Sequence, residues 1–148
     1  AAPRIAVLTG RLDLDLDSAL FSGAAAGAGT IVITSGVAAA DRRAAAGAHA
    51  EVIVAGEQRV DLPAAVAALA GRGHRRILAE GGPHLLGQLA AVGLIDELCV
   101  TVSPVLAVGS AGRITQGPPG SDGRAGLELA HVLADGSYLF CRYLVQRG

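Results

Sequence analysis

The sequence predicts an α/β protein built on a mostly parallel sheet. Short apolar runs alternate with alanine-rich segments of helical length, and most of the runs end in glycine or a small polar residue. That alternation is typical of parallel β-α-β units, because each helix carries the chain back to begin the next strand. A final pair of apolar runs is separated by Asp135-Gly136, which predicts an antiparallel hairpin at the end of the sheet.

Bulk composition limits the class of protein. The 148 residues suit a single domain, and 51% apolar against 17% charged residues indicates a globular chain. The formal charge is −1 and the basic residues form no cluster, which argues against a nucleic-acid partner. No apolar stretch is long enough to cross a bilayer and none resembles a signal peptide, so we predict no membrane association and a cytoplasmic location.

The first half of the chain predicts three strands and two helices. Pro63 suits the first turn of a helix that Asp61 begins, since a missing N–H costs nothing there. Residues 12–17 alternate Leu with Asp, but aspartate is a poor strand former, so an extended surface loop is expected. The predicted elements are strands at residues 5–8, 30–34 and 51–54, and helices at residues 38–47 and from Asp61 to Gly71 or Gly73.

The second half predicts a strand, a helix and a strand in one parallel unit, then a loop and the hairpin. The loop is rich in Gly, Pro and Ser. Cys99 and Cys141 lie in apolar runs and are expected to be buried and reduced. The predicted elements are a strand at residues 76–79, a helix from Pro83 to Gly93, a strand at 98–102, a loop at 109–126 and hairpin strands at 127–133 and 138–145.

The turn from Glu80 to Pro83 is the strongest candidate site. Gly81 and Gly82 lack Cβ atoms, so a ligand can approach the backbone closely. Pro83 then begins a helix, whose N-terminus carries a partial positive charge that favours phosphate. Glu80 is expected at the carboxyl end of its strand, where open α/β sheets bind ligands and where its carboxylate can accept hydrogen bonds from ligand hydroxyls. The alternative is that the two glycines only turn the chain.

Other polar residues have a weaker signal. His84 is predicted in the first helical turn, where it either contacts the ligand or is merely exposed. Thr9-Gly10 and Thr34-Ser35 end predicted strands and could contact a nucleotide. His49, His74 and His131 lack the spacing of metal ligands, so no metal site is predicted.

With these residues in view, the chain resembles the reductase domain of riboflavin biosynthesis, a family with the dihydrofolate-reductase-like fold. The likeness extends over nearly the whole sequence, and the paired motifs EGGP and GLIDEL are fairly specific. The matching stretches are RIAVLTG (4–10), TIVITS (30–35), ILAEGGPHLLG (77–87), GLIDEL (93–98), VSPVLAVG (102–109) and HVLADGSYLFCRY (131–143).

The resemblance implies a three-layer αβα sandwich and an NADPH-dependent reductase, in which hydride transfer reduces the ribose of a phosphoribosylamino-pyrimidine to a ribityl group. Glu80 resembles the glutamate that contacts substrate, and Thr9 resembles a small hydroxyl residue near the cofactor. No catalytic residue is identified. The stretch that resembles the phosphate-wrapping segment of the cofactor site is Gly81, Gly82, Pro83, His84, Leu85, Leu86, Gly87 and Gln88.

One departure from the family pattern is expected to matter. Family members carry several dozen residues before the strand that RIAVLT resembles, including a Ser-x-Asp-Gly motif, whereas this chain begins almost on that strand. We therefore expect a carboxyl-terminal portion of a reductase domain, with little or no turnover in an NADPH oxidation assay by itself.

Two alternatives remain open beside the reductase. One is a nucleotide-binding module of the same fold that does no chemistry. The other is that the terminal hairpin serves mainly as an interface in a homodimer, because it holds Tyr138, Phe140 and Tyr143, three of the four aromatic residues.

Overall fold

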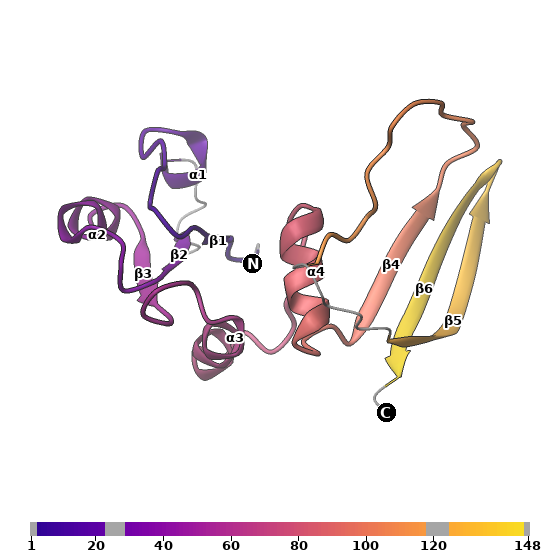
Figure 1. The fold of residues 1–148 in the computed structure, drawn as a ribbon. Helices are drawn as coiled ribbons and strands as arrows, with labels where there is room; N and C mark the ends of the chain where they lie inside the picture. Colours follow the sequence, from indigo (N-terminus) through magenta and orange to yellow (C-terminus); the bar gives the residue numbers. More distant parts are fainter. Residues whose placement is uncertain (1–2, 23–28, 118–124, 147–148) are drawn as a thin grey trace. The chain divides into compact units, whose positions relative to one another are not determined.

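The computed structural model describes residues 3–22, 29–117 and 125–146. The chain divides into two compact units, Ala1–Ile77 and Leu78–Gly148, and each is described by itself. Figure 1 identifies the elements of both units, with the first unit in indigo to magenta and the second in pink to yellow. None of the helices in the described ranges combines the length and the apolar character needed to cross a bilayer.

The first unit is a three-stranded parallel sheet with helices on both faces. The strands follow the order β1-β2-β3, and β2 pairs with both neighbours, Ile33 lying opposite Leu8 and Ile53. This arrangement confirms the three strands predicted in the first half. Its elements are β1 (Ala6–Leu8), α1 (Ala19–Ser22), β2 (Ile31–Thr34), α2 (Ala40–Gly47), β3 (Glu51–Val54) and α3 (Leu62–Gly71).

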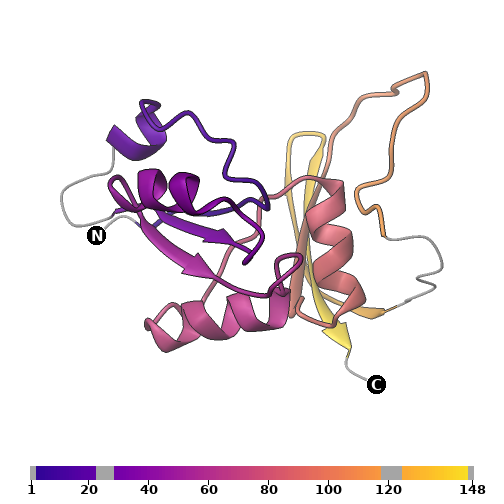
Figure 2. The same ribbon diagram turned by 60° about the vertical axis from the view of Figure 1, so that its left-hand side comes forward.

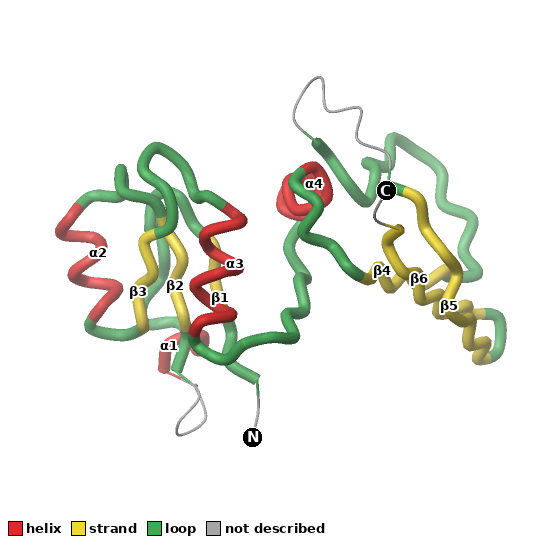
Figure 3. Tube along the Cα trace, turned by 90° about the horizontal axis from the view of Figure 1, so that it is seen from below, coloured by secondary structure: helices red, strands yellow, loops and turns green. Residues whose placement is uncertain are grey.

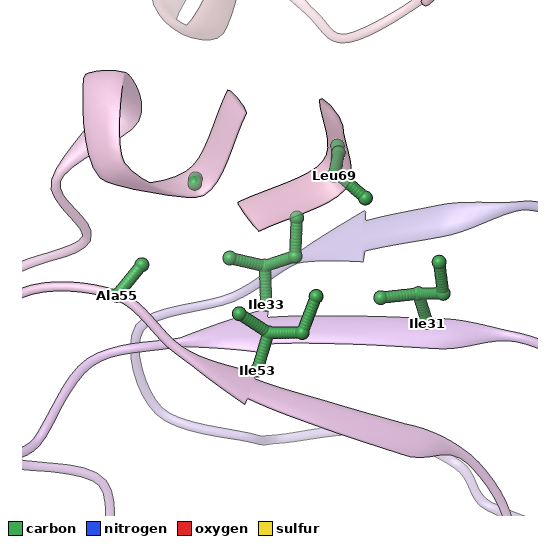
Figure 4. Packing of buried hydrophobic residues seen from close by; sticks show 6 residues of the cluster. Ile31, Ile33, Ile53, Ala55 and Leu69 are labelled. Atoms are coloured by element: carbon green, nitrogen blue, oxygen red, sulfur yellow. The ribbon is translucent and has the colours of Figure 1, made fainter. Parts of the chain in front are cut away.

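The core of this unit has two layers, because β2 is covered on both faces. Figure 3 shows α2 on one side of the strands and α3 on the other. Ile31 and Ile33 pack toward Leu69 of α3, as Figure 4 shows. Val32 packs on the opposite face with Ala46 of α2. A strand buried on both faces reads as a continuous apolar run, which is why the pattern at residues 30–34 was so clear.

The structure also tests two local predictions, the helix start at Asp61 and the loop at residues 12–17. Asp61 is the N-cap of α3 as predicted, and its side chain accepts a hydrogen bond from the Ala64 amide at 2.9 Å. Residues 12–17 form neither a strand nor a regular helix, in agreement with the predicted loop. The loop is not merely a surface feature, however, because Leu12 is only 6% exposed and packs in the core with Leu14 and Leu16.

The second unit contains one helix and an antiparallel sheet in the order β4-β6-β5. The hairpin predicted around Asp135-Gly136 is confirmed, and Gly136 has the positive φ of 57° that such a turn requires. Figure 2 shows this hairpin in yellow. The elements are α4 (Pro83–Ala91), β4 (Glu97–Val102), β5 (Gly126–Asp135) and β6 (Tyr138–Gln146).

The strand predicted at residues 76–79 is wrong. The described chain has no regular secondary structure there and pairs with no strand, and Leu78 is 80% exposed. An isolated strand has no partner for its backbone N–H and C=O groups, so apolar character alone does not form one. The parallel strand-helix-strand unit predicted around α4 is therefore absent, and β4 pairs antiparallel with β6 instead.

The prediction that both cysteines are buried is also wrong. Cys99 is exposed and Cys141 is half-buried, and both are free thiols. In the register of β4 and β6, Cys99 lies opposite Arg142 while Cys141 lies opposite Val100, so the two thiols are on opposite faces of the sheet. The apolar runs around them belong to strands of a three-stranded sheet whose faces are largely exposed in this unit.

Glu51 connects two arginines at the amino end of β3, and this cluster makes stability depend on pH. Hydrogen bonds from Arg72 and from Arg4, the latter at 2.9 Å, hold the pKa of the Glu51 carboxyl below its ordinary value of 4.5. A depressed pKa stabilises the folded state above the unfolded pKa, and this stabilisation is lost as pH falls through the folded value.

We therefore predict that Glu51→Gln lowers the free energy of unfolding at pH 7 and that the difference from wild type shrinks below about pH 4.5. Urea unfolding at a series of pH values measures it. Glu57→Gln, which changes an exposed loop carboxylate, serves as the control. A difference that stays constant from pH 7 to pH 3 contradicts the assignment.

Candidate functional site

Helix α4 begins without a side-chain cap. Gly82 is the N-cap residue, with φ −63° and ψ 177°, and no side chain accepts a hydrogen bond from the first turn. No acidic residue lies in that turn either. Helix α3 differs, because Asp61 occupies the same position there and satisfies an amide. The positive end of α4 is thus left open for an anion.

Only a few amides at this end lack a partner within the helix. The Leu86 amide donates to the Gly82 carbonyl at 3.2 Å, so helical hydrogen bonding begins at that residue. Pro83 has no N–H, which leaves the amides of His84 and Leu85 facing outward along the helix axis. Two neighbouring amides at a helix N-terminus form the kind of site that binds phosphate or carboxylate.

The two glycines have different structural roles. A Cβ on Gly81 would lie 2.5 Å from Cδ2 of Leu85, so the absence of a side chain at position 81 leaves room for the Leu85 side chain. A Cβ on Gly82 would have no atom within 4 Å, and its φ is one that any residue adopts. Nothing in the fold of the described residues therefore requires glycine at position 82. The open space above it is suited to a ligand that approaches the backbone.

Glu80 lies two residues before the N-cap, in an exposed segment without regular secondary structure. It does not end a strand as predicted, because residues 76–79 form none. Its side chain does not cap α4. A carboxylate beside a bound phosphate would repel it, so Glu80 is suited to hydroxyl groups in a neighbouring part of a ligand.

The remaining predicted residues lie deeper in α4. Leu86, Gly87 and Gln88 belong to the second turn, where amides are engaged in helical hydrogen bonds. Gly87 is buried, and a Cβ there would lie 2.3 Å from the carbonyl oxygen of Gln116. The sequence interpretation missed this packing role, although a glycine inside a helix is itself a signal of a close approach.

The contact at Gly87 fixes the loop that follows β4. The Gln116 amide donates to the Pro83 carbonyl at 2.9 Å, so the returning loop is anchored on the first turn of α4. Two contacts, one at Pro83 and one at Gly87, therefore position residues 115–117 along one side of the helix. The open amides and the anchored loop belong to the same end of α4.

Thr9 belongs to the first unit, at the end of β1. Its hydroxyl oxygen accepts a hydrogen bond from the Leu12 amide at 3.2 Å, which stabilises a loop where Leu12 has a positive φ of 55°. The Thr9 hydroxyl proton is still free for a ligand, since a hydroxyl can donate and accept at once. The structure thus gives Thr9 a local structural role, and its contact with a cofactor stays a prediction.

Thr34 and Ser35 end the central strand β2. Both side chains are 0% exposed, and their hydroxyl oxygens find no hydrogen-bond partner among the described residues. His84 is exposed at the first turn of α4. In the described ranges, no three His, Cys, Asp or Glu side chains come close enough together to hold a metal ion.

One protein-family model matches most of the chain. The family model described as "RibD C-terminal domain" matches residues 1–140. The chain belongs to this family, which confirms the resemblance to the reductase domain of riboflavin biosynthesis.

Two archaeal reductases are similar to this chain in sequence. Both are named 2,5-diamino-6-ribosylamino-4(3H)-pyrimidinone 5′-phosphate reductase. The one from Methanothermobacter thermautotrophicus is 34% identical over 120 residues, which cover 79% of this chain and 56% of the relative. The one from Archaeoglobus fulgidus is 36% identical over 76 residues, or 51% of this chain and 35% of the relative. The chain thus spans little more than half the length of the reductases it matches.

Solved structures confirm the predicted fold class. A pyrimidine reductase-like protein from Corynebacterium diphtheriae has a TM-score of 0.81 and 26% identity, covering 99% of this chain and 62% of that protein. RibD from Acinetobacter baumannii has a TM-score of 0.75 at 18% identity, covering 97% of this chain and 38% of that protein, a likeness of fold. The chain has the dihydrofolate-reductase-like α/β fold, with both parallel and antiparallel sheets.

The packing at Gly87 gives a prediction about the loop. Gly87→Ala places a methyl group against the Gln116 carbonyl and should release the loop from α4, because backbone cannot move aside as cheaply as a side chain. Hydrogen exchange of the Gln116 amide should become much faster in the variant. Gly71→Ala, where a Cβ meets nothing within 4 Å, is the matched control and should leave this amide protected. Unchanged protection in Gly87→Ala contradicts the packing role.

Proposed function

We propose that this member of the RibD C-terminal domain family belongs to an NADPH-dependent reductase of a phosphoribosylamino-pyrimidine in riboflavin biosynthesis. The relatives support the reaction class, since two of them are named as reductases of a ribosylamino-pyrimidinone 5′-phosphate. The observation that carries the proposal within this chain is the uncapped N-terminus of α4 beneath the open space at Gly82. Because the chain spans 56% of the first relative, the activity of the whole protein is part of the proposal.

The residues present fit a nicotinamide dinucleotide. Its pyrophosphate is an anion that two helix-end amides can bind, and the donors needed are those of His84 and Leu85. No carboxylate in the first turn opposes it. Gly82 has no Cβ, and a Cβ there would meet no atom within 4 Å. Phosphate oxygens can therefore approach the backbone at this position.

The side chains then have separate roles in the proposed reaction. A bound nicotinamide cofactor would supply the hydride for reduction of the sugar. Glu80, which is exposed two residues before the N-cap of α4, binds and orients the substrate by accepting hydrogen bonds from its hydroxyl groups. The loop anchored at Gln116 holds the first turn of α4 in place. Preorganised donors of this kind contribute by orientation rather than by chemistry of their own.

A second candidate is a nucleotide-binding module of the same fold without catalysis. The same open helix end supports it, and the two candidates differ only in turnover. An NADPH oxidation assay with the pyrimidine substrate separates them. A cytoplasmic location stays a prediction.

The test of the cofactor site is Gly82→Val. The valine is compatible with the backbone at this position and its Cβ would have no atom within 4 Å, but its side chain fills the space where phosphate would approach the amides. NADPH affinity should fall by about tenfold or more, the cost of losing hydrogen bonds to a charged group. Titration calorimetry measures it. Gly81 is unsuitable for this test, because a Cβ there would displace Leu85.

Ala91→Val adds the same kind of bulk at the other, exposed end of α4 and serves as the matched control. It should bind NADPH as wild type does. Equal NADPH affinity in Gly82→Val and wild type would mean that the glycine only turns the chain.

Glu80→Gln tests the substrate contact. The amide keeps the size of the side chain but removes a charge that strengthens hydrogen bonds from ligand hydroxyls, so affinity for the pyrimidine substrate should fall by about tenfold. NADPH affinity should stay unchanged. A variant that loses NADPH instead would place Glu80 at the cofactor.

The partners in the proposal include a second copy of the chain. The rings of Tyr138 and Phe140 stack with centroids 6.5 Å apart, yet they remain 44% and 42% exposed. Leu133 lies opposite Phe140 in the hairpin and is 62% exposed. Exposed aromatic and aliphatic groups on one face of a sheet favour an interface. We propose that a second copy of the chain covers this face in a homodimer.

Phe140→Ser should therefore shift the protein toward monomer in sedimentation velocity experiments. Val132→Ser is the control, since Val132 is equally exposed at 43% but lies on the opposite face of the hairpin. A dimer that survives Phe140→Ser and dissociates with Val132→Ser assigns the interface to the other face.

A further inference from the structure

The loop that follows β4 in the second unit carries exposed aliphatic side chains. Residues 103–116, which we call the strap, contain no helix or strand. Leu106 is 95% exposed and Val108 96%, more than any other large apolar side chain among the described residues. Val105 and Ile114 of the same loop are exposed as well. Apolar side chains gathered in one exposed segment mark a surface that binds something.

Both ends of the strap are fixed. Val102, which precedes it, lies opposite Leu139 in the ladder between β4 and β6. At the other end, the Gln116 amide donates to the Pro83 carbonyl at 2.9 Å, in the first turn of α4. Figures 1 and 2 show the strap leaving the end of β4 and returning beside α4. The strap therefore begins on the sheet and ends at the turn of α4 that carries the open amides.

The middle of the strap is held by few contacts. Gly109 has a φ of 112°, a conformation that other residues rarely adopt, and a Cβ there would meet no atom within 4 Å. The Ala111 amide donates to the Gly109 carbonyl at 3.1 Å. Within the described chain, no other backbone hydrogen bond holds residues 103–115. A segment with so few hydrogen bonds and buried contacts can change position at low cost in free energy.

The strap is also long enough to cover the open end of α4. Val108 lies eight residues before Gln116, which is a span of up to roughly 26 Å when the chain is extended. The contact of Gln116 with Gly87 lies about one helical turn, roughly 5 Å along the axis, from the open amides. Val108 can therefore reach a ligand bound at those amides while Gln116 stays in place.

From these contacts we propose that the strap closes over a nicotinamide dinucleotide bound at the N-terminus of α4, with Leu106 and Val108 packed against its ring surfaces. The proposal rests on the proposed function, which puts the cofactor at this helix end. Removal of the aliphatic side chains from water favours the closed position. Closure of a loop over a ligand also excludes water from the reacting atoms, which a hydride transfer needs.

Leu106→Trp reports closure directly, because the chain contains no other tryptophan. Leu106 is almost fully exposed, so the variant should fold as wild type does. NADP⁺ is the ligand, since it does not absorb at the wavelength of tryptophan emission. On its addition, the emission should shift to shorter wavelength and acrylamide should quench it less. Val92→Trp, at the opposite end of α4, is the matched control and should show neither change.

Leu106→Ser measures what closure contributes to binding. Because the serine has no aliphatic surface to bury, NADP⁺ affinity in calorimetric titration should fall by about tenfold. Val92→Ser makes the same change at the opposite end of α4 and should bind NADP⁺ as wild type does. Wild-type affinity in Leu106→Ser overturns the packing of Leu106 on the ligand.

Failure of the strap and failure of the proposed function give different results. If NADP⁺ binds wild type and is lost in Gly82→Val, but the emission of Leu106→Trp does not move at saturation, the cofactor proposal stands and closure is overturned. Emission already at short wavelength without nucleotide also overturns closure, and its dependence on protein concentration would assign the strap to a second copy. If NADP⁺ does not bind wild type, the cofactor proposal fails and closure over the cofactor fails with it.

Discussion

The open N-terminus of α4 is the feature on which this account depends. A helix begins with amides that nothing inside it can satisfy, and proteins usually cover them with a side chain such as Asp61 at α3. At α4 the N-cap is Gly82, which has no side chain to offer. The amides of His84 and Leu85 are therefore held in fixed positions at the positive end of a helix dipole, with open space at Gly82 beside them.

The contacts of Gly81, Gly87 and Gln116 hold the first two turns of α4 in position. Gly81 leaves room for Leu85, and Gly87 lets the backbone at Gln116 approach closely enough for its amide to reach the Pro83 carbonyl. Removing a Cβ at either position serves packing, whereas at Gly82 it serves no packing among the described residues. Three glycines within seven residues thus have three different physical reasons, and only one of them points to a ligand.

Sequence reasoning was accurate where burial decides structure by itself. The continuous apolar run of β2, the cap at Asp61 and the Asp-Gly hairpin were all recognisable, because each signal is local. It failed where secondary structure or burial depends on which other part of the chain packs or pairs with a segment. Residues 76–79 have the composition of a strand, but a strand needs a neighbour, and composition does not tell whether one is present. The exposure of Cys99 and the core position of Leu12 depend on tertiary packing in the same way.

For the candidate site, the sequence predicts a ligand-binding turn but does not predict the different structural roles of the residues within it. The resemblance assigns residues 81–88 to one phosphate-binding stretch, and only the backbone geometry separates the open amides from the residues engaged in the helix. The most direct test is an amide NMR titration with NADPH. The account predicts large shifts for the His84 and Leu85 amides at the lowest NADPH concentrations. Shifts confined to other residues, with these two amides unmoved at saturation, would contradict it.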